Sequence, residues 1–232
     1  MIGFPVRIEE AVVWTRREIG LAVVCLAVGS AGQLVQYVVS PLGSPEAAPA
    51  DNIARAMAHP TAMEWASWLD LSILFFLPAL VVVAWLAGAR STRLGWVAAV
   101  VAIATTVPGI AYLLAPDVLY VAAVHGAVTA RAIEAAGGVS VVQVATLVFL
   151  VGHVLGLLLL AVALWRAGSV PRWAVVCLAL SPLLEFGGSA AGSRPVVIAG
   201  YVLLTAAFGA CAMAVARPHA RIAVPAPVLA RP

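Results

Sequence analysis

The chain has 232 residues, of which 64% are hydrophobic and only 10% are charged, and its formal net charge is +3. Soluble domains are about 45–50% apolar and about 25% charged, so this composition argues against a water-soluble globular fold. The basic residues are all arginine and stand in ones and twos beside apolar segments. That spread is typical of membrane-topology signals, and it argues against nucleic acid as a partner, which needs a clustered basic surface.

Six segments are long and apolar enough to be membrane-spanning helices, which need roughly 20 mainly apolar residues. They cover approximately residues 19–39, 68–88, 94–115, 141–165, 173–190 and 195–216. The sequence therefore predicts an all-α fold, a polytopic bundle of six transmembrane helices over residues 19–216. A cytoplasmic interfacial segment, 1–18, is expected before it and a disordered proline-rich cytoplasmic tail, 217–232, after it.

The two longest connections each contain a short helical pattern. In the first, Asp51 or Asn52 is the expected N-cap of a helix that runs through Ala58. In the second, Asp117 is the expected N-cap of a helix that ends at Gly137 and Gly138. Both connections are expected to place short interfacial helices at the outer face of the membrane.

Arginine placement predicts the orientation of the chain. If the six segments all span, ten arginines lie on one side and only three, Arg55, Arg131 and Arg194, on the other. Cytoplasmic loops carry the excess of arginine, so both termini are predicted to be cytoplasmic. The absence of lysine, with abundant alanine, valine, glycine and proline, is typical of a high-GC bacterial genome. The expected location is therefore the bacterial plasma membrane, with the lipid bilayer as partner.

No cofactor is expected. Cys25, Cys177 and Cys211 stand alone in three different apolar segments, without the CxxC or Cys/His spacing of a disulfide framework or a zinc site. The histidines form none of the HxxxH, HExxH or HxH patterns, so no metal site is predicted. Only one histidine lies deep in a predicted span, which argues against paired haem ligation.

Two ionisable residues lie deep in consecutive spans. His153 is 12 residues before Trp165, and Glu185 is 12 residues after Trp173. At 1.5 Å per residue, each lies roughly 18 Å from the cytoplasmic side. Consecutive antiparallel helices usually touch, so His153 and Glu185 are predicted to form a polar pair at the midplane.

Three interpretations of these residues stay open at the level of sequence. The pair is a structural clasp between two helices, since histidine forms interhelical hydrogen bonds in membranes. Alternatively, the pair is a functional site that relays protons or binds a cation. In the third interpretation the fifth span ends early, and Glu185 lies near the outer surface in contact with water.

Pro78, Pro108 and Pro182 lie well inside three of the spans, at similar depth. Each proline removes a helical hydrogen bond. A belt of kinks at one depth is one way in which broken helices line a binding cavity. The simpler alternative is that these prolines only bend their helices, as prolines in membrane helices commonly do.

A second polar group is expected in the outer half of the bundle, as an outward-facing vestibule. Its candidates are Gln33 and Gln36 on the first span, Asp70 at the outer start of the second, and Tyr112 near the outer end of the third.

Gly152 and Gly156, which flank His153, form a GxxxG motif that lets helix backbones approach closely. Such small-residue faces pack helices within one chain or between chains. They therefore also suggest a homo- or hetero-oligomer.

The hairpin sequence HVLGLLLLAVALWRAGSVPRWAVV, residues 153–176, follows an earlier hairpin, LFFLPALVVVAWLAGARSTRLGW, residues 74–96. Together they resemble a broad group of uncharacterised actinobacterial membrane proteins with six predicted spans and an Ala-Leu-Trp-Arg, Pro-Arg-Trp cytoplasmic hairpin. The resemblance covers about residues 68–184. It implies a similar six-helix bundle and no known activity, so it assigns no catalytic residue.

The sequence favours a non-enzymatic integral membrane protein of unknown role. The first alternative is a carrier of small solutes or protons that uses His153 and Glu185. The second is an intramembrane enzyme, although the sequence has no GxSxG elbow and no phosphate-binding loop.

Overall fold

The computed structural model describes residues 14–43, 47–88 and 92–217, except for the side chains of residues 92 and 110–115. The sequence interpretations of most of segment 1–18 and of the tail after residue 217 therefore lie outside the described residues. Within the described residues the chain forms nine α-helices and no strand. The all-α prediction is confirmed for them. The helices are α1 (Arg16–Val39), α2 (Pro49–Ala58), α3 (Pro60–Asp70), α4 (Ile73–Gly88), α5 (Thr92–Val124), α6 (Ala130–Gly137), α7 (Ser140–Ala167), α8 (Arg172–Ala190) and α9 (Arg194–Ala216).

Five stretches are long and apolar enough to cross a membrane: Arg16–Val39, Pro60–Gly88, Ser140–Ala167, Arg172–Ala190 and Arg194–Ala216. They correspond to the first, second, fourth, fifth and sixth predicted spans. The third predicted span lies in α5, where the apolar stretch Arg93–Gly109 is shorter. The helical bundle and its apolar helices are those expected of a multi-pass membrane protein.

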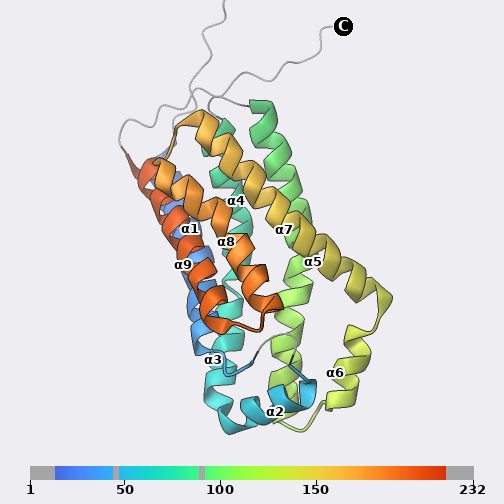
Figure 1. Cartoon of the computed structure of the whole chain (residues 1–232). Helices are drawn as coiled ribbons and strands as arrows, with labels where there is room; N and C mark the ends of the chain where they lie inside the picture. The colour runs from blue at the N-terminus through green and yellow to red at the C-terminus, as the bar shows by residue number, and fades with distance from the viewer. Residues whose placement is uncertain (1–13, 44–46, 89–91, 218–232) are drawn as a thin grey trace, which may run out of the picture.

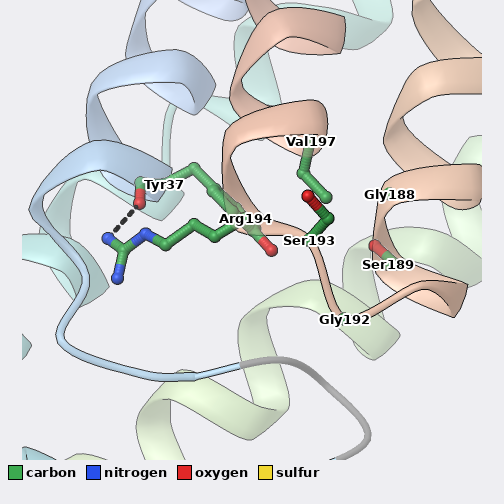
Figure 2. A pocket seen from close by; sticks show the side chains of 7 residues that line it. All are labelled: Tyr37, Gly188, Ser189, Gly192, Ser193, Arg194 and Val197. Atoms are coloured by element: carbon green, nitrogen blue, oxygen red, sulfur yellow. Dashed lines mark hydrogen bonds between the residues drawn. The ribbon is translucent and has the colours of Figure 1, made fainter.

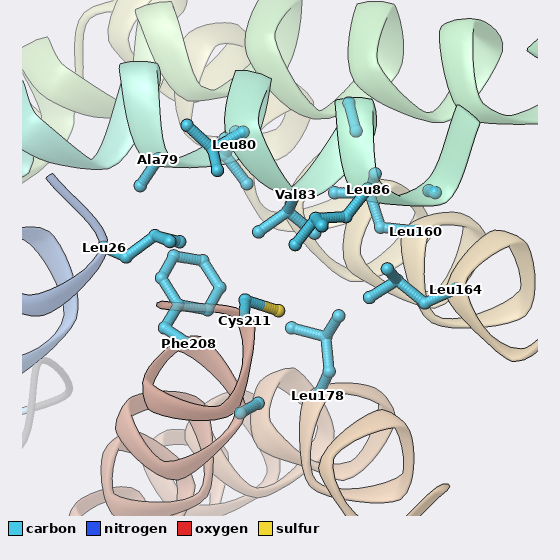
Figure 3. Packing of buried hydrophobic residues seen from close by; sticks show 14 of the residues in the cluster. Leu26, Ala79, Leu80, Val83, Leu86, Leu160, Leu164, Leu178, Phe208 and Cys211 are labelled. Atoms are coloured by element: carbon cyan, nitrogen blue, oxygen red, sulfur yellow. The ribbon is translucent and has the colours of Figure 1, made fainter. Parts of the chain in front are cut away.

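The six long helices α1, α4, α5, α7, α8 and α9 run side by side and alternate in direction (Figure 1). Helices α2, α3 and α6 lie at one end of this bundle, and the end of α7 and the start of α8 lie at the other. The core is built from leucines and small residues of α1, α4, α7, α8 and α9 around the buried ring of Phe208 (Figure 3). Leu26, Leu80, Leu160, Leu178 and Cys211 are each at most 1% exposed. This close packing fixes which faces of α7 and α8 meet.

The first outer connection is more helical than the sequence suggests. Helix α2 ends at Ala58 as predicted, but it begins at Pro49, and no side chain caps it. Asp51 lies in its first turn instead of at the cap. A further helix, α3, occupies the rest of the connection and is separated from α4 only by Leu71 and Ser72.

The prediction that Asp117 caps a separate outer helix is wrong. Helix α5 continues through Pro116 and Asp117 to Val124, so Asp117 lies inside it. The helix ends before Gly126, whose φ of 73° is a conformation that glycine adopts at low cost. The cap of α6 is Thr129, whose hydroxyl accepts a hydrogen bond from the Ala132 N–H. At 1.5 Å per residue, the 33 residues of α5 extend about 50 Å, which is longer than a bilayer core of about 30 Å.

Arg194 joins the start of α9 to the end of α1. Its Nη2 donates to the carbonyls of Tyr37 (2.8 Å), Val38 (3.1 Å) and Ser40 (2.7 Å), and its Nη1 donates to that of Leu42 (3.4 Å). Figure 2 shows the guanidinium reaching the Tyr37 carbonyl. The last carbonyls of a helix have no partner within it, so one arginine side chain satisfies the C-terminal end of α1.

The variant Arg194→Ala is expected to lower the free energy of unfolding by about 1–2 kcal/mol, because it leaves these carbonyls without a charged donor. Arg194→Lys should restore only part of the loss, since an ammonium group lacks the planar fork of a guanidinium. Denaturant unfolding in detergent micelles measures both. The control is Arg131→Ala on α6, where the arginine is exposed. Equal stabilities of wild type and Arg194→Ala would contradict this role.

Candidate functional site: the buried His153–Glu185 pair

The fold brings His153 of α7 and Glu185 of α8 together. The two helices are antiparallel neighbours joined by a short turn at Gly168, whose φ is 64°. His153 Nε2 lies 3.6 Å from Glu185 Oε2, and each side chain is only 8% exposed. The interpretation in which Glu185 lies near the outer surface and meets water therefore does not fit the structure.

Aromatic rings surround the imidazole. The ring centroid of Phe149 lies 5.3 Å from that of His153, that of Phe186 lies 5.8 Å away edge-on, and that of Phe76 lies 6.1 Å away in a stacked arrangement. These rings belong to α4, α7 and α8, so the pair is enclosed on several sides by apolar side chains. In such surroundings opposite charges attract strongly, and a charge without a partner is costly.

The hydrogen-bonding capacity of the pair is incompletely used. His153 Nε2 and Glu185 Oε1 are both buried and have no hydrogen-bond partner among the described residues. The separation of 3.6 Å is too long for a hydrogen bond, and the contact is an ion pair only when the imidazole is protonated. On the other side of Glu185, a Cβ on Gly200 of α9 would lie 2.7 Å from Glu185 Cγ. Helix α9 therefore packs directly on the carboxyl side chain.

A small cavity lies elsewhere, near the start of α9. It has a volume of about 10 Å³ and is lined by Tyr37, Gly188, Ser189, Gly192, Ser193, Arg194 and Val197 (Figure 2). That volume is close to the lower limit for one water molecule. Neither His153 nor Glu185 lines this cavity.

The three prolines lie inside α4, α5 and α8, but they do not share one environment. Pro78 is exposed, Pro108 is half-buried and Pro182 is buried. None of them lines the small cavity beside Arg194. The arrangement fits prolines that bend their own helices better than a belt of kinks around a common binding site.

The outer polar candidates form a second buried group. Gln33 Nε2 donates to Asp70 Oδ1 (3.3 Å), to the Asp70 carbonyl (3.3 Å) and to Ser72 Oγ (3.1 Å). Gln36 Nε2 donates to Asp117 Oδ2 at 2.9 Å. Asp70 is 2% exposed and Asp117 is 6% exposed, so the group is buried and does not form an open vestibule. The side chain of Tyr112 lies outside the described residues.

Asp117, which the sequence places in the outer loop as a helix cap, is instead a buried member of this group on α5. Burial raises the pKa of Asp117 to about 6, and the hydrogen bond from Gln36 offsets part of that rise. Two glutamines three residues apart on an apolar helix indicate that polar partners lie beside it, because each glutamine needs a partner when it is buried.

The GxxxG glycines pack α7 against α5. A Cβ on Gly156 would lie 2.7 Å from Ala102 Cα, and a Cβ on Gly152 would overlap the side chain of Thr105. The close approach that the motif permits is therefore between α7 and α5 of the same chain.

The described part of the chain contains no cluster of metal-binding side chains and no disulfide bond. No three His, Cys, Asp or Glu side chains gather there as a metal site would require. Cys25, Cys177 and Cys211 are free thiols on α1, α8 and α9. Comparison with known proteins found no matching family model, no matching curated protein and no matching solved structure.

Proposed function

We propose that this chain is a non-enzymatic, multi-pass protein of the bacterial plasma membrane with both termini in the cytoplasm. The long apolar helices support the membrane assignment. Support for the orientation comes from the arginines, which concentrate at the loops on the side of the termini. The resemblance to six-span actinobacterial membrane proteins is part of the same proposal, and it adds no activity.

The central polar pair acts, in this proposal, as a clasp that fastens α7 to α8. The observation that carries it is the 3.6 Å contact between two side chains that are each only 8% exposed. Tight packing by Phe76, Phe149 and Gly200 encloses the pair and leaves its helices little freedom to separate. Reversible unfolding of the His153→Ala variant tests the clasp.

A proton-coupled carrier of small solutes is the second candidate. His153 Nε2 and Glu185 Oε1, which are buried without a hydrogen-bond partner among the described residues, favour it, because ionisable residues inside a span commonly mark ion or proton pathways. In that role the bundle has two conformations. In one of them a proton binds between the two side chains, and in the other the proton is released.

The carrier role predicts that His153→Ala abolishes proton movement driven by a solute. Wild type and variant are reconstituted into liposomes that contain a pH-sensitive dye, and a panel of sugars, amino acids and organic cations is added outside. At least one solute should change the internal pH with wild type and none with the variant, while His125→Ala behaves as wild type. Unchanged proton movement in His153→Ala, or none with any solute in wild type, would reject the carrier.

An intramembrane enzyme is the third candidate and has the least support. It needs a water-filled cavity with at least two converging polar groups. The cavity beside Arg194 has room for about one water molecule. The Arg194 guanidinium is already committed to the carbonyls at the end of α1.

A further inference from the structure

Two buried carboxyl groups meet on one face of α1. Gln33 and Gln36 are three residues apart, so their side chains lie on the same side of that helix. Each amide holds one carboxyl group: Gln33 holds Asp70 of α3, and Gln36 holds Asp117 of α5. The two amides lie about one helical turn apart, so they hold the two carboxyl groups at neighbouring positions along α1. Carboxyl groups from two different helices are thus gathered at one site.

Among the described residues, no cationic side chain forms an ion pair with either carboxyl group. The ion pairs there join His125 to Glu64 and His153 to Glu185. Helix α1 presents only the two amides. Helix α2 presents Asn52, whose amide donates to the Tyr120 hydroxyl at 3.5 Å. The charged residues of α2 and α6 are exposed: Asp51, Arg55, Arg131 and Glu134.

One oxygen of the site has no partner. Asp70 Oδ2 is inaccessible to solvent and accepts no hydrogen bond, whereas Oδ1 accepts one from Gln33. An ionised carboxylate in this position would lose its hydration without compensation, which is far more costly than burying the neutral acid. A second carboxylate nearby adds repulsion, and sites of two close carboxyl groups avoid ionising both.

We propose that Asp70 and Asp117, held by the amides of Gln33 and Gln36, form a proton-binding site between α1, α3 and α5. The site takes one proton at neutral pH, and Asp70 Oδ2 is the oxygen to which the new O–H bond forms. The amides keep donating to the other oxygens, so they fix the two acids without supplying a charge. This site is separate from His153 and Glu185 and does not depend on the carrier role.

The direct test is infrared spectroscopy of the purified protein in lipid at neutral pH. A protonated carboxyl group has a carbonyl stretch that is resolved from the carboxylate bands. The wild type should show such a band that is missing from Asp70→Asn and that disappears when the pH is raised. Glu185→Gln is the control for a signal from the central pair. Identical bands in wild type, Asp70→Asn and Asp117→Asn would overturn the proposal.

Thermal unfolding against pH provides a second readout. The raised pKa of Asp117, about 6, lies above its ordinary value of 3.8. The folded state therefore binds more protons than the unfolded state, and stability is lost as the pH rises through that range. The Tm of wild type should fall by roughly 5 °C between about pH 4 and about pH 7. The double variant Asp70→Asn, Asp117→Asn should lose this dependence, and Glu134→Gln should keep it.

A metal cation is the competing ligand, and the same assay separates it from a proton. If Na⁺ or Ca²⁺ raises the Tm of wild type above about pH 8 but leaves the double variant unchanged, the carboxyl groups bind that cation and the proton assignment falls. If neither ion changes the Tm and the pH dependence is present only with both acids, the site binds a proton.

Discussion

Replacing His153 by alanine is expected to lower the free energy of unfolding by about 3–5 kcal/mol, the range found when one partner of a buried ion pair is removed. Glu185 would then remain buried, 3.6 Å from the position that the imidazole Nε2 has left, with α9 packed on its other side. The measurement is reversible unfolding in detergent micelles. An unchanged stability would contradict the clasp.

The chain contains its own control for this experiment. His125 Nε2 also lies 3.6 Å from a glutamate oxygen, Glu64 Oε1, but these side chains are 63% and 54% exposed. Exposed pairs contribute between about 0 and 1 kcal/mol, so His125→Ala should change stability little. The two variants remove the same type of contact at the same distance, and they differ in burial.

A double variant distinguishes the loss of the pair from the loss of packing. His153→Phe combined with Glu185→Met replaces both polar groups by apolar side chains of similar size. The new ring would join Phe76, Phe149 and Phe186, which already surround position 153. Buried ion pairs replaced in this way are often neutral or stabilised, so the double variant should recover most of the stability that His153→Ala loses.

The second large effect is expected at the contact between α5 and α7. In Gly156→Ala the new Cβ would lie 2.7 Å from Ala102 Cα and 3.0 Å from Ala102 N. Backbone atoms cannot move aside as a flexible side chain can, so the two helices must separate. Overpacking of this kind costs about 1–3 kcal/mol, and the unfolding free energy should fall accordingly.

Gly209→Ala on α9 is the matched control, since it is also a glycine within a long apolar helix. Beyond its own turn of α9, no atom of the described residues lies within 4 Å of a Cβ at Gly209. Alanine favours helix over glycine by about 1 kcal/mol, so this variant should be slightly stabilised. The same chemical change should therefore have opposite signs at the two positions. Destabilisation of both by equal amounts would mean that α5 and α7 do not pack as described.

Several features of the fold follow from local sequence. Long apolar runs must form helices in a membrane, because only helices and closed barrels satisfy their own backbone groups there. Short connections make consecutive helices antiparallel neighbours, and a fixed rise per residue then sets depth. His153 and Glu185, each 12 residues from a tryptophan at the same turn, meet for that reason.

Local sequence misplaced Asp117 for an equally physical reason. A proline followed by an aspartate is typical of a helix start, but here both continue α5. Proline within a helix is tolerated when neighbouring groups compensate. The carboxyl group of Asp117 has such a neighbour in Gln36 of α1, which is 81 positions away along the chain. No local pattern contains that contact.

The sequence by itself determined the long apolar helices and the matching levels of His153 and Glu185 on two of them, because these depend on composition and on the regular helical rise. Only the tertiary structure decided which faces meet: His153 toward Glu185, Gly156 toward Ala102, and Asp70 with Asp117 beside one face of α1. The reason is that an amphipathic stripe marks the inner face of a helix in a soluble protein. A helix that is apolar on every side carries no such mark, so its orientation is set by packing alone.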